Sequence, residues 1–211
     1  MLAALTGAYF LWMQISQTQV ALLDKRQREL DKTRILAQFQ LSTLISHVDL
    51  MAKDIKTILD TNGKETSRHF DAWPTPALEA LANMQLHLED KDRVQIGQLF
   101  MDMQVLQSRV VGVAFSGYNS YIYWRGDWIL NGCLLAKVKS GINSLFGYCR
   151  LETNTFPSII CLVDRTHNTF SFWDIDLKKD DDPGVDDKKI ISRWIDRHAK
   201  LPVAWYEKSA K

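Results

Sequence analysis

Apolar residues recur seven positions apart over residues 20–59, and this repeat constrains the fold more than any other feature of the sequence. One row contains Val20, Gln27, Arg34, Leu41, Val48 and Ile55, and the other contains Leu23, Leu30, Ala37, Leu44, Met51 and Ile58. Ten of these twelve residues are apolar, and the polar Gln27 and Arg34 weaken the first half of the seam. The two rows are offset by three and four residues, so they lie side by side on one face of an α-helix. A long amphipathic helix is therefore predicted over residues 24–62, ending at Asn62-Gly63.

This apolar face has two possible uses. In a coiled coil it would contact a second copy of the chain, so we expect self-association through a set of candidate interaction residues. They are Leu30, Leu41, Leu44, Val48, Met51 and Ile55. The neighbouring Ile35, Leu36 and Phe39 widen the stripe beyond a narrow two-stranded seam, so the same helix also suits the core of its own bundle.

Residues 1–23 contain no charged side chain. A helix of this length rises about 35 Å, enough to cross a hydrocarbon layer about 30 Å thick. We therefore expect a membrane anchor that stays attached, although Gln14, Gln17 and Gln19 make the crossing marginal. The alternatives are the buried start of a soluble helix and a helix that lies in the membrane interface.

Basic residues follow the uncharged segment, among them Lys25, Arg26 and Arg28. Cytoplasmic flanks of membrane helices carry an excess of Lys and Arg. The expected location is thus a single-pass membrane protein with its C-terminal body in the cytoplasm.

The rest of the chain, residues 63–211, is expected to form a mostly helical globular body. Helical spacing and capping signals predict segments from Thr75-Pro76 to about Glu89, over about 94–113, over about 127–149, and over 188–200. The cluster at residues 89–92 is interpreted as a solvated turn. The runs at residues 159–163 and 169–173 suggest a β-hairpin. The fold class is therefore mainly α, a small helical bundle with a possible β-hairpin.

Two groups of aromatic residues are further candidate interaction sites. The first is Tyr118, Tyr121, Tyr123, Trp124 and Trp128. Aromatic rings with polar tips often form recognition surfaces, although core packing is the commoner explanation. The second is Trp194, on the apolar side of the basic amphipathic helix near the C-terminus, which could lie on an anionic membrane surface or dock on the body.

No pattern of residues points to catalysis or to a cofactor. The five histidines show no H-E-x-x-H spacing, the three cysteines show no C-x-x-C pair, and the acidic run at residues 180–187 lacks the order of a calcium loop. Nucleotide-binding glycine motifs are also absent from the sequence. We predict no catalytic, cofactor-binding or metal residue. The balance of 26 basic and 25 acidic residues gives no case for nucleic-acid binding.

These features favour a membrane-tethered, non-catalytic interaction, signalling or scaffold protein that self-associates through its long N-terminal helix. Its expected partners are the membrane and either a second copy or another protein. One alternative is an enzyme whose site is assembled from distant histidine and carboxylate residues. Another is a membrane-perturbing effector in which Gln14 and Gln17 face an oligomeric interior.

Overall fold

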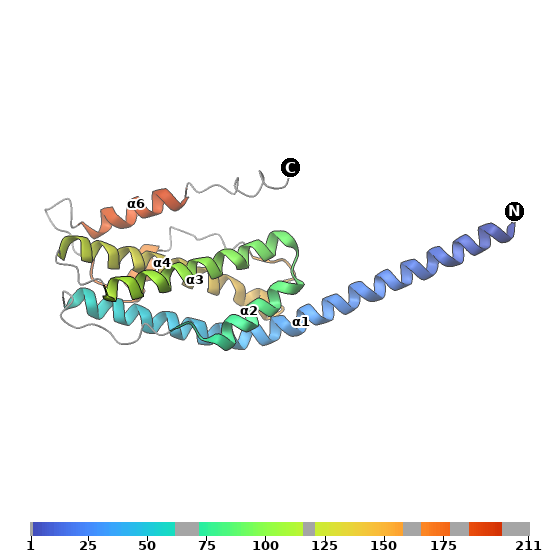
Figure 1. Cartoon of the computed structure of the whole chain (residues 1–211), viewed down its shortest axis with the longest axis horizontal. Coiled ribbons are helices and arrows are strands. Elements are labelled where there is room, and N and C mark those ends of the chain that lie inside the picture. Colours follow the sequence, from blue (N-terminus) through green and yellow to red (C-terminus); the bar gives the residue numbers. More distant parts are fainter. Residues whose placement is uncertain (1, 62–71, 116–120, 158–165, 178–185, 200–211) are drawn as a thin grey trace.

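The computed structural model describes residues 2–61, 72–115, 121–157, 166–177 and 186–199. It is mainly helical, and these ranges contain six helices (Figure 1). They are α1 (Leu2–Asp60), α2 (Thr75–His87), α3 (Asp90–Phe115), α4 (Tyr121–Cys149), α5 (Thr166–Phe172) and α6 (Asp187–Ala199). The sequence-based prediction of a mainly α fold is confirmed.

The first helix has two parts with different surroundings. Its C-terminal part packs in a bundle with α2 and α4, while its N-terminal part projects away from the bundle (Figure 1). From Ala37 to Ile58 the side chains of the repeat are buried, and from Tyr9 to Arg28 almost every side chain is exposed. A single unbroken helix therefore forms both a core element and a projecting stalk, which we define as residues 2–28.

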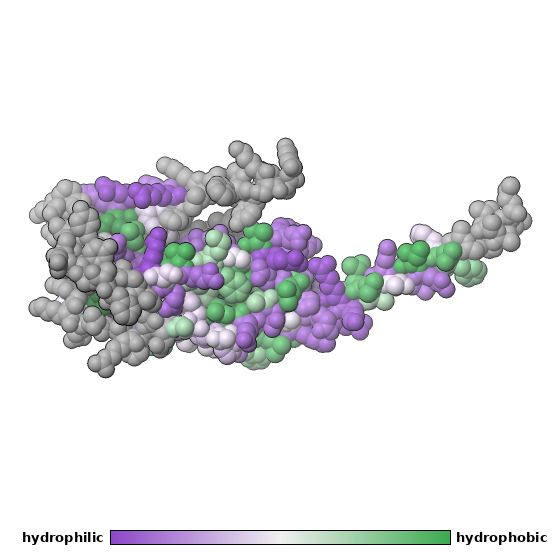
Figure 2. Space-filling view, in the orientation of Figure 1, coloured by the Kyte–Doolittle hydropathy of each residue, from purple (hydrophilic) through white to green (hydrophobic). Residues whose placement is uncertain are grey.

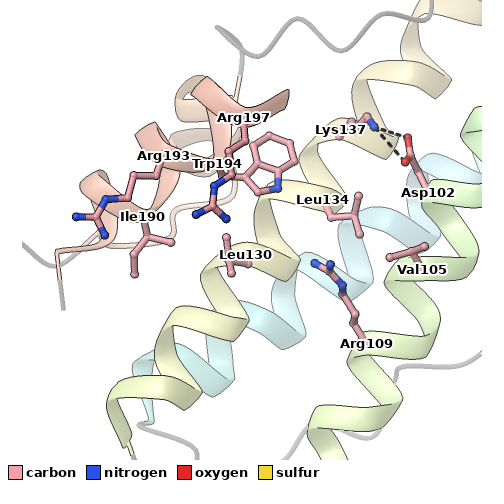
Figure 3. Close-up of a pocket in the computed structure, with 10 residues that line it drawn as sticks. All are labelled: Asp102, Val105, Arg109, Leu130, Leu134, Lys137, Ile190, Arg193, Trp194 and Arg197. Carbon is pink, nitrogen blue, oxygen red and sulfur yellow. Dashed lines mark hydrogen bonds and ion pairs between the residues drawn. The ribbon is translucent and has the colours of Figure 1, made fainter. Parts of the chain in front are cut away.

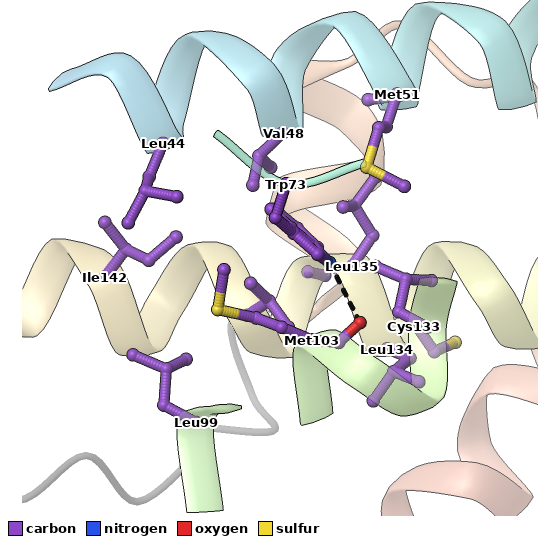
Figure 4. Close-up of a cluster of buried hydrophobic side chains, with 14 of the residues drawn as sticks. Leu44, Val48, Met51, Trp73, Leu99, Met103, Cys133, Leu134, Leu135 and Ile142 are labelled. Atoms are coloured by element: carbon purple, nitrogen blue, oxygen red, sulfur yellow. Dashed lines mark hydrogen bonds between the residues drawn. The ribbon is translucent and has the colours of Figure 1, made fainter. Parts of the chain in front are cut away.

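The bundle is organised around α4, which contacts α1, α3, α5 and α6. Because it has neighbours on several sides, its buried residues are not confined to one narrow stripe. They include Ile129, Cys133, Leu135, Val138, Ile142 and Leu145. Between α1 and α3 lies Trp73, whose Nε1 donates a hydrogen bond of 2.9 Å to the Met103 carbonyl (Figure 4).

Two buried arginines connect the ends of helices. Arg34 in α1 donates from Nε and Nη2 to the Tyr148 carbonyl, at 2.8 and 2.6 Å. That carbonyl lies in the last turn of α4, where backbone acceptors have no partner within the helix. Arg125, near the start of α4, forms an ion pair of 2.6 Å with Asp187, the first residue of α6. An acidic side chain at this end of α6 also complements the helix dipole.

The predicted membrane-spanning anchor at residues 1–23 is not supported. Residues 2–23 are helical, but no helix in the described ranges is both long and apolar enough to cross a bilayer. The physical reason lies in the polar residues between Gln14 and Gln19, which dilute the apolar run before it.

Three further expectations require correction. In the second half of the predicted β-hairpin, residues 169–172 are helical and Trp173 lies in the turn that follows, because this arrangement buries both Phe170 and Trp173. The first half, residues 159–163, lies outside the described residues. Residues 90–92 form the first turn of α3, where Asp90 and Asp92 favour the positive end of the helix dipole. Finally, α4 begins at Tyr121, six residues before the predicted start.

Candidate functional site

The residues predicted to mediate self-association lie inside the bundle. Leu41, Leu44, Val48, Met51 and Ile55 are each 0% exposed, and Leu30 is partly buried against the same core. Within one chain they pack against α2 and α4. A second copy could reach them only if the bundle opened, so the alternative use of the repeat, as a core face, explains them.

The aromatic candidates are divided between the core and residues that the structure does not describe. Trp128 is 2% exposed and Trp194 is 5% exposed, so both indoles are largely inside the protein. The backbones of Tyr121, Tyr123 and Trp124 form the first turn of α4. Their side chains, and the whole of Tyr118, lie outside the described residues.

The stalk carries the largest group of exposed apolar side chains on α1. Tyr9, Phe10, Leu11 and Trp12 are 58–65% exposed. Consecutive residues of a helix are about 100° apart, so these four side chains surround the whole circumference. Figure 2 shows further hydrophobic surface along this projecting helix. The other exposed large apolar residues of the stalk are Ile15, Val20, Leu22 and Leu23.

The distribution of these side chains decides what can cover them. A partner helix in a two-stranded coiled coil covers one stripe, whereas a helix that is apolar on all sides is typically surrounded by lipid or by several helices. Tyr9 and Trp12, whose ring centroids are 6.3 Å apart, are residue types enriched where a membrane meets water. The tip of the stalk therefore presents apolar and aromatic side chains to its surroundings on every side.

A second candidate site is a cavity of about 360 Å³ between α3, α4 and α6 (Figure 3). Its lining is Asp102, Val105, Arg109, Leu130, Leu134, Lys137, Ile190, Arg193, Trp194 and Arg197. No sequence motif predicts this site, because its basic residues come from three helices that are far apart in the chain. The related sequence feature is the excess of basic residues over residues 188–200, which equally suits a solvated or membrane-facing side of a helix.

Charge in this cavity is predominantly positive. Lys137 is paired with Asp102 at 2.8 Å. Within the described part of the chain, Arg109, Arg193 and Arg197 form no ion pair. Three guanidinium groups therefore stand beside an apolar surface without a carboxylate partner from the described helices.

The described residues offer little for the enzyme alternative. Among the residues described, the cavity lining contains one carboxylate, that of Asp102, and no histidine. The imidazole of His47 lies instead against Trp73, with ring centroids 5.0 Å apart. No group of three potential metal ligands occurs in the residues described.

The buried cysteines are also poor nucleophiles. Burial raises the pKa of the Cys149 thiol to about 11, although Arg34 nearby acts in the opposite direction. At neutral pH this thiol is protonated, and its Sγ lies 3.8 Å from the Met84 sulfur. Cys133 is likewise fully buried. Both side chains act as core residues.

Comparison with protein-family models, curated proteins and solved structures finds no match to this chain. The geometry of the stalk and of the cavity is therefore the basis for proposing a function.

Proposed function

We propose that this chain is a membrane-tethered, non-catalytic interaction protein, in which the stalk attaches the helical bundle to a membrane surface without crossing it. The observation that carries the proposal is the ring of exposed apolar side chains at Tyr9, Phe10, Leu11 and Trp12. The bundle then acts as the head that presents binding surfaces to partners.

The energetics favour an apolar environment for this tip. Burying a large apolar side chain contributes about 1.5–3 kcal/mol relative to leaving it in water. A helix without tertiary packing is only marginally stable in water, so contact with lipid would also stabilise the stalk. Membrane contact by an amphipathic or apolar helix requires no spanning segment, which agrees with the hydropathy of α1.

Self-association is the competing explanation for the same surface. Because the repeat is buried between Ala37 and Ile58, a second copy that covered the tip could not extend its contact along this row of α1. One partner helix would cover one stripe of the ring at residues 9–12 and leave the rest in water. Lipid can cover every side, so we favour the membrane.

Vesicle co-sedimentation of the full chain tests this proposal with matched substitutions. The test variant carries Phe10→Ser and Leu11→Ser, at positions 65% and 61% exposed. The control carries Phe39→Ser and Leu36→Ser in the bundle part of α1, at positions 66% and 63% exposed. The test variant should bind phosphatidylcholine–phosphatidylglycerol vesicles about a hundredfold more weakly, because two apolar side chains no longer enter lipid. The control should bind as the unchanged chain does.

The oligomeric state, measured without lipid by sedimentation velocity, separates the two explanations. If the unchanged chain fails to bind vesicles, or if both variants lose binding equally, membrane tethering is rejected. A defined oligomer in buffer that the Phe10/Leu11 variant converts to a monomer would show that a second copy covers the tip.

A further inference from the structure

The cavity between α3, α4 and α6 combines an apolar floor with a basic rim. Leu130 and Leu134 of α4 form its floor, while Val105 of α3 and Ile190 and Trp194 of α6 form its walls. Helices α3 and α6 both pack on α4, and the space between them remains open. A volume of about 360 Å³ lies within the range of small-molecule sites.

The basic rim brings together guanidinium groups from two helices. Figure 3 shows Arg109 extending from α3 toward Leu134, and Arg197 descending from α6 beside Trp194. Arg193 lies at the outer edge of the same site. Lys137 is already paired with Asp102, so it supplies little net charge. Asp127 is the other carboxyl close to Arg109, but the two form no ion pair within the described residues.

We propose that this cavity binds a small organic phosphate, with the phosphate group between Arg109 and Arg197 and an apolar group on the floor formed by Leu130 and Leu134. A planar guanidinium offers two parallel N–H donors to phosphate oxygens, a geometry that suits phosphate better than a point charge does. A phosphate monoester carries about two negative charges at neutral pH, which matches the two arginines that face the cavity. The apolar floor favours an ester with a hydrocarbon or aromatic group over inorganic phosphate.

This proposal is independent of membrane tethering by the stalk. The stalk tip ends near Met13, and the bundle begins near Arg34, about 30 Å further along α1 at 1.5 Å per residue. None of the cavity residues belongs to α1. If the tip fails to bind vesicles, the proposal for the cavity still stands. If the cavity fails to bind phosphate, the proposal for the stalk still stands.

Isothermal titration calorimetry with phenyl phosphate, inorganic phosphate and phenol tests the combination of charge and apolar floor. Phenyl phosphate should bind at one site per chain, and both inorganic phosphate and phenol should bind at least about tenfold more weakly. Raising the salt concentration should weaken the binding of phenyl phosphate, because the arginines are exposed to solvent and dissolved ions screen their charge.

Three substitutions locate the site. The double variant Arg109→Gln/Arg197→Gln should bind phenyl phosphate more weakly, by about tenfold for each arginine removed. Val105→Trp should fill the cavity and abolish selectivity for phenyl phosphate over inorganic phosphate, with the arginines retained. Arg150→Gln removes an exposed arginine at the far end of α4 and should leave binding unchanged. Circular dichroism verifies that each variant retains its helicity.

Several outcomes would overturn the proposal. They are the absence of saturable phenyl phosphate binding, equal weakening by Arg150→Gln, and unchanged binding in the Arg109/Arg197 variant. The source of the phosphate is a separate question that vesicles answer. The Phe10→Ser/Leu11→Ser chain is mixed with vesicles containing phosphatidic acid: binding that depends on Arg109 and Arg197 identifies a lipid headgroup, and binding of phenyl phosphate alone identifies a soluble ester.

Discussion

Gly132 allows the ring of Phe170 to lie directly on α4. A Cβ atom at this position would lie 2.7 Å from Phe170 Cζ and 3.1 Å from Cε1. Phe170 is 0% exposed, so its ring has little room to move away. The glycine that lowers the helix propensity of α4 thus allows α5 to pack closely on it.

Alanine substitutions at two glycines should therefore have opposite effects on stability. Gly132→Ala should lower the free energy of unfolding by about 1 kcal/mol, because overpacking against Phe170 outweighs the gain in helix propensity. Gly97→Ala should raise it by up to about 1 kcal/mol, since the nearest atom to a new Cβ is Gln85 Nε2 at 3.7 Å. Urea unfolding followed by circular dichroism measures both. A stabilised Gly132→Ala chain would contradict the packing argument.

At Arg34, a local sequence pattern does not predict that the side chain is buried or which groups it binds. It interrupts the apolar row of α1, and from the sequence it only weakens the predicted coiled-coil seam. In the folded chain it is 1% exposed and donates hydrogen bonds to the carbonyls of Tyr148 and Thr153. These acceptors are more than a hundred residues away in the sequence, so no local period predicts the contact.

At the scale of elements, the sequence predicted helices best where apolar spacing and end signals agree. The segment predicted from Thr75-Pro76 forms α2, and the segment at 188–200 forms α6, with ends within two residues of those expected. The run Thr169–Trp173 alternates polar and apolar residues, which suits a strand as well as a short helix. Packing of Phe170 and Trp173 in the core, with α5 against α4, decides between these structures.

The Arg125–Asp187 ion pair should control how firmly α6 is attached to α4. Arg125→Met leaves the fully buried Asp187 carboxylate without its guanidinium, a change that costs about 3–5 kcal/mol for buried pairs. We expect a lower free energy of unfolding and faster amide exchange in α6, measured by hydrogen–deuterium exchange mass spectrometry.

Two further chains control this prediction. Arg125→Met with Asp187→Leu should recover part of the lost stability, because no charge remains buried at that position. Lys189→Met removes the ion pair between the half-exposed Lys189 side chain and Asp186, which directly precedes α6, but keeps the hydrogen bond from the Lys189 backbone N–H to Asp186, so exchange in α6 should be nearly unchanged. Equal exchange in the Arg125→Met chain and the unchanged chain would show that apolar contacts alone hold α6.

At the scale of the whole molecule, the stalk and the bundle are separate in their packing. The described side chains before Arg26 make no contact with the core, and Arg26 makes only long hydrogen bonds of 3.4 Å to the carbonyls of His87 and Leu88. Deleting residues 1–23 should therefore change the Tm by less than about 2 °C. A chain that loses its cooperative melting transition would show that the stalk is needed for folding.

The candidate sites were harder to predict than the fold for a physical reason. A seven-residue period shows that one face of a helix is buried, but it does not distinguish burial within one chain from burial against another. Leu41, Leu44 and Met51 satisfy the period equally well in both cases. The sequence does not predict the cavity, because Arg109 and Arg197 line the same site only after α3 and α6 have both packed on α4.

The continuity of α1 also has a mechanical consequence. A rod of 59 residues, about 90 Å long, links the apolar tip directly to the centre of the bundle, with no flexible linker between them. A pulling force on the tip therefore acts first on the backbone hydrogen bonds of the stalk, which has no tertiary packing to keep it helical. The stalk should unwind under load before the contacts of Leu41 and Leu44 break, so it limits the tension that reaches the core.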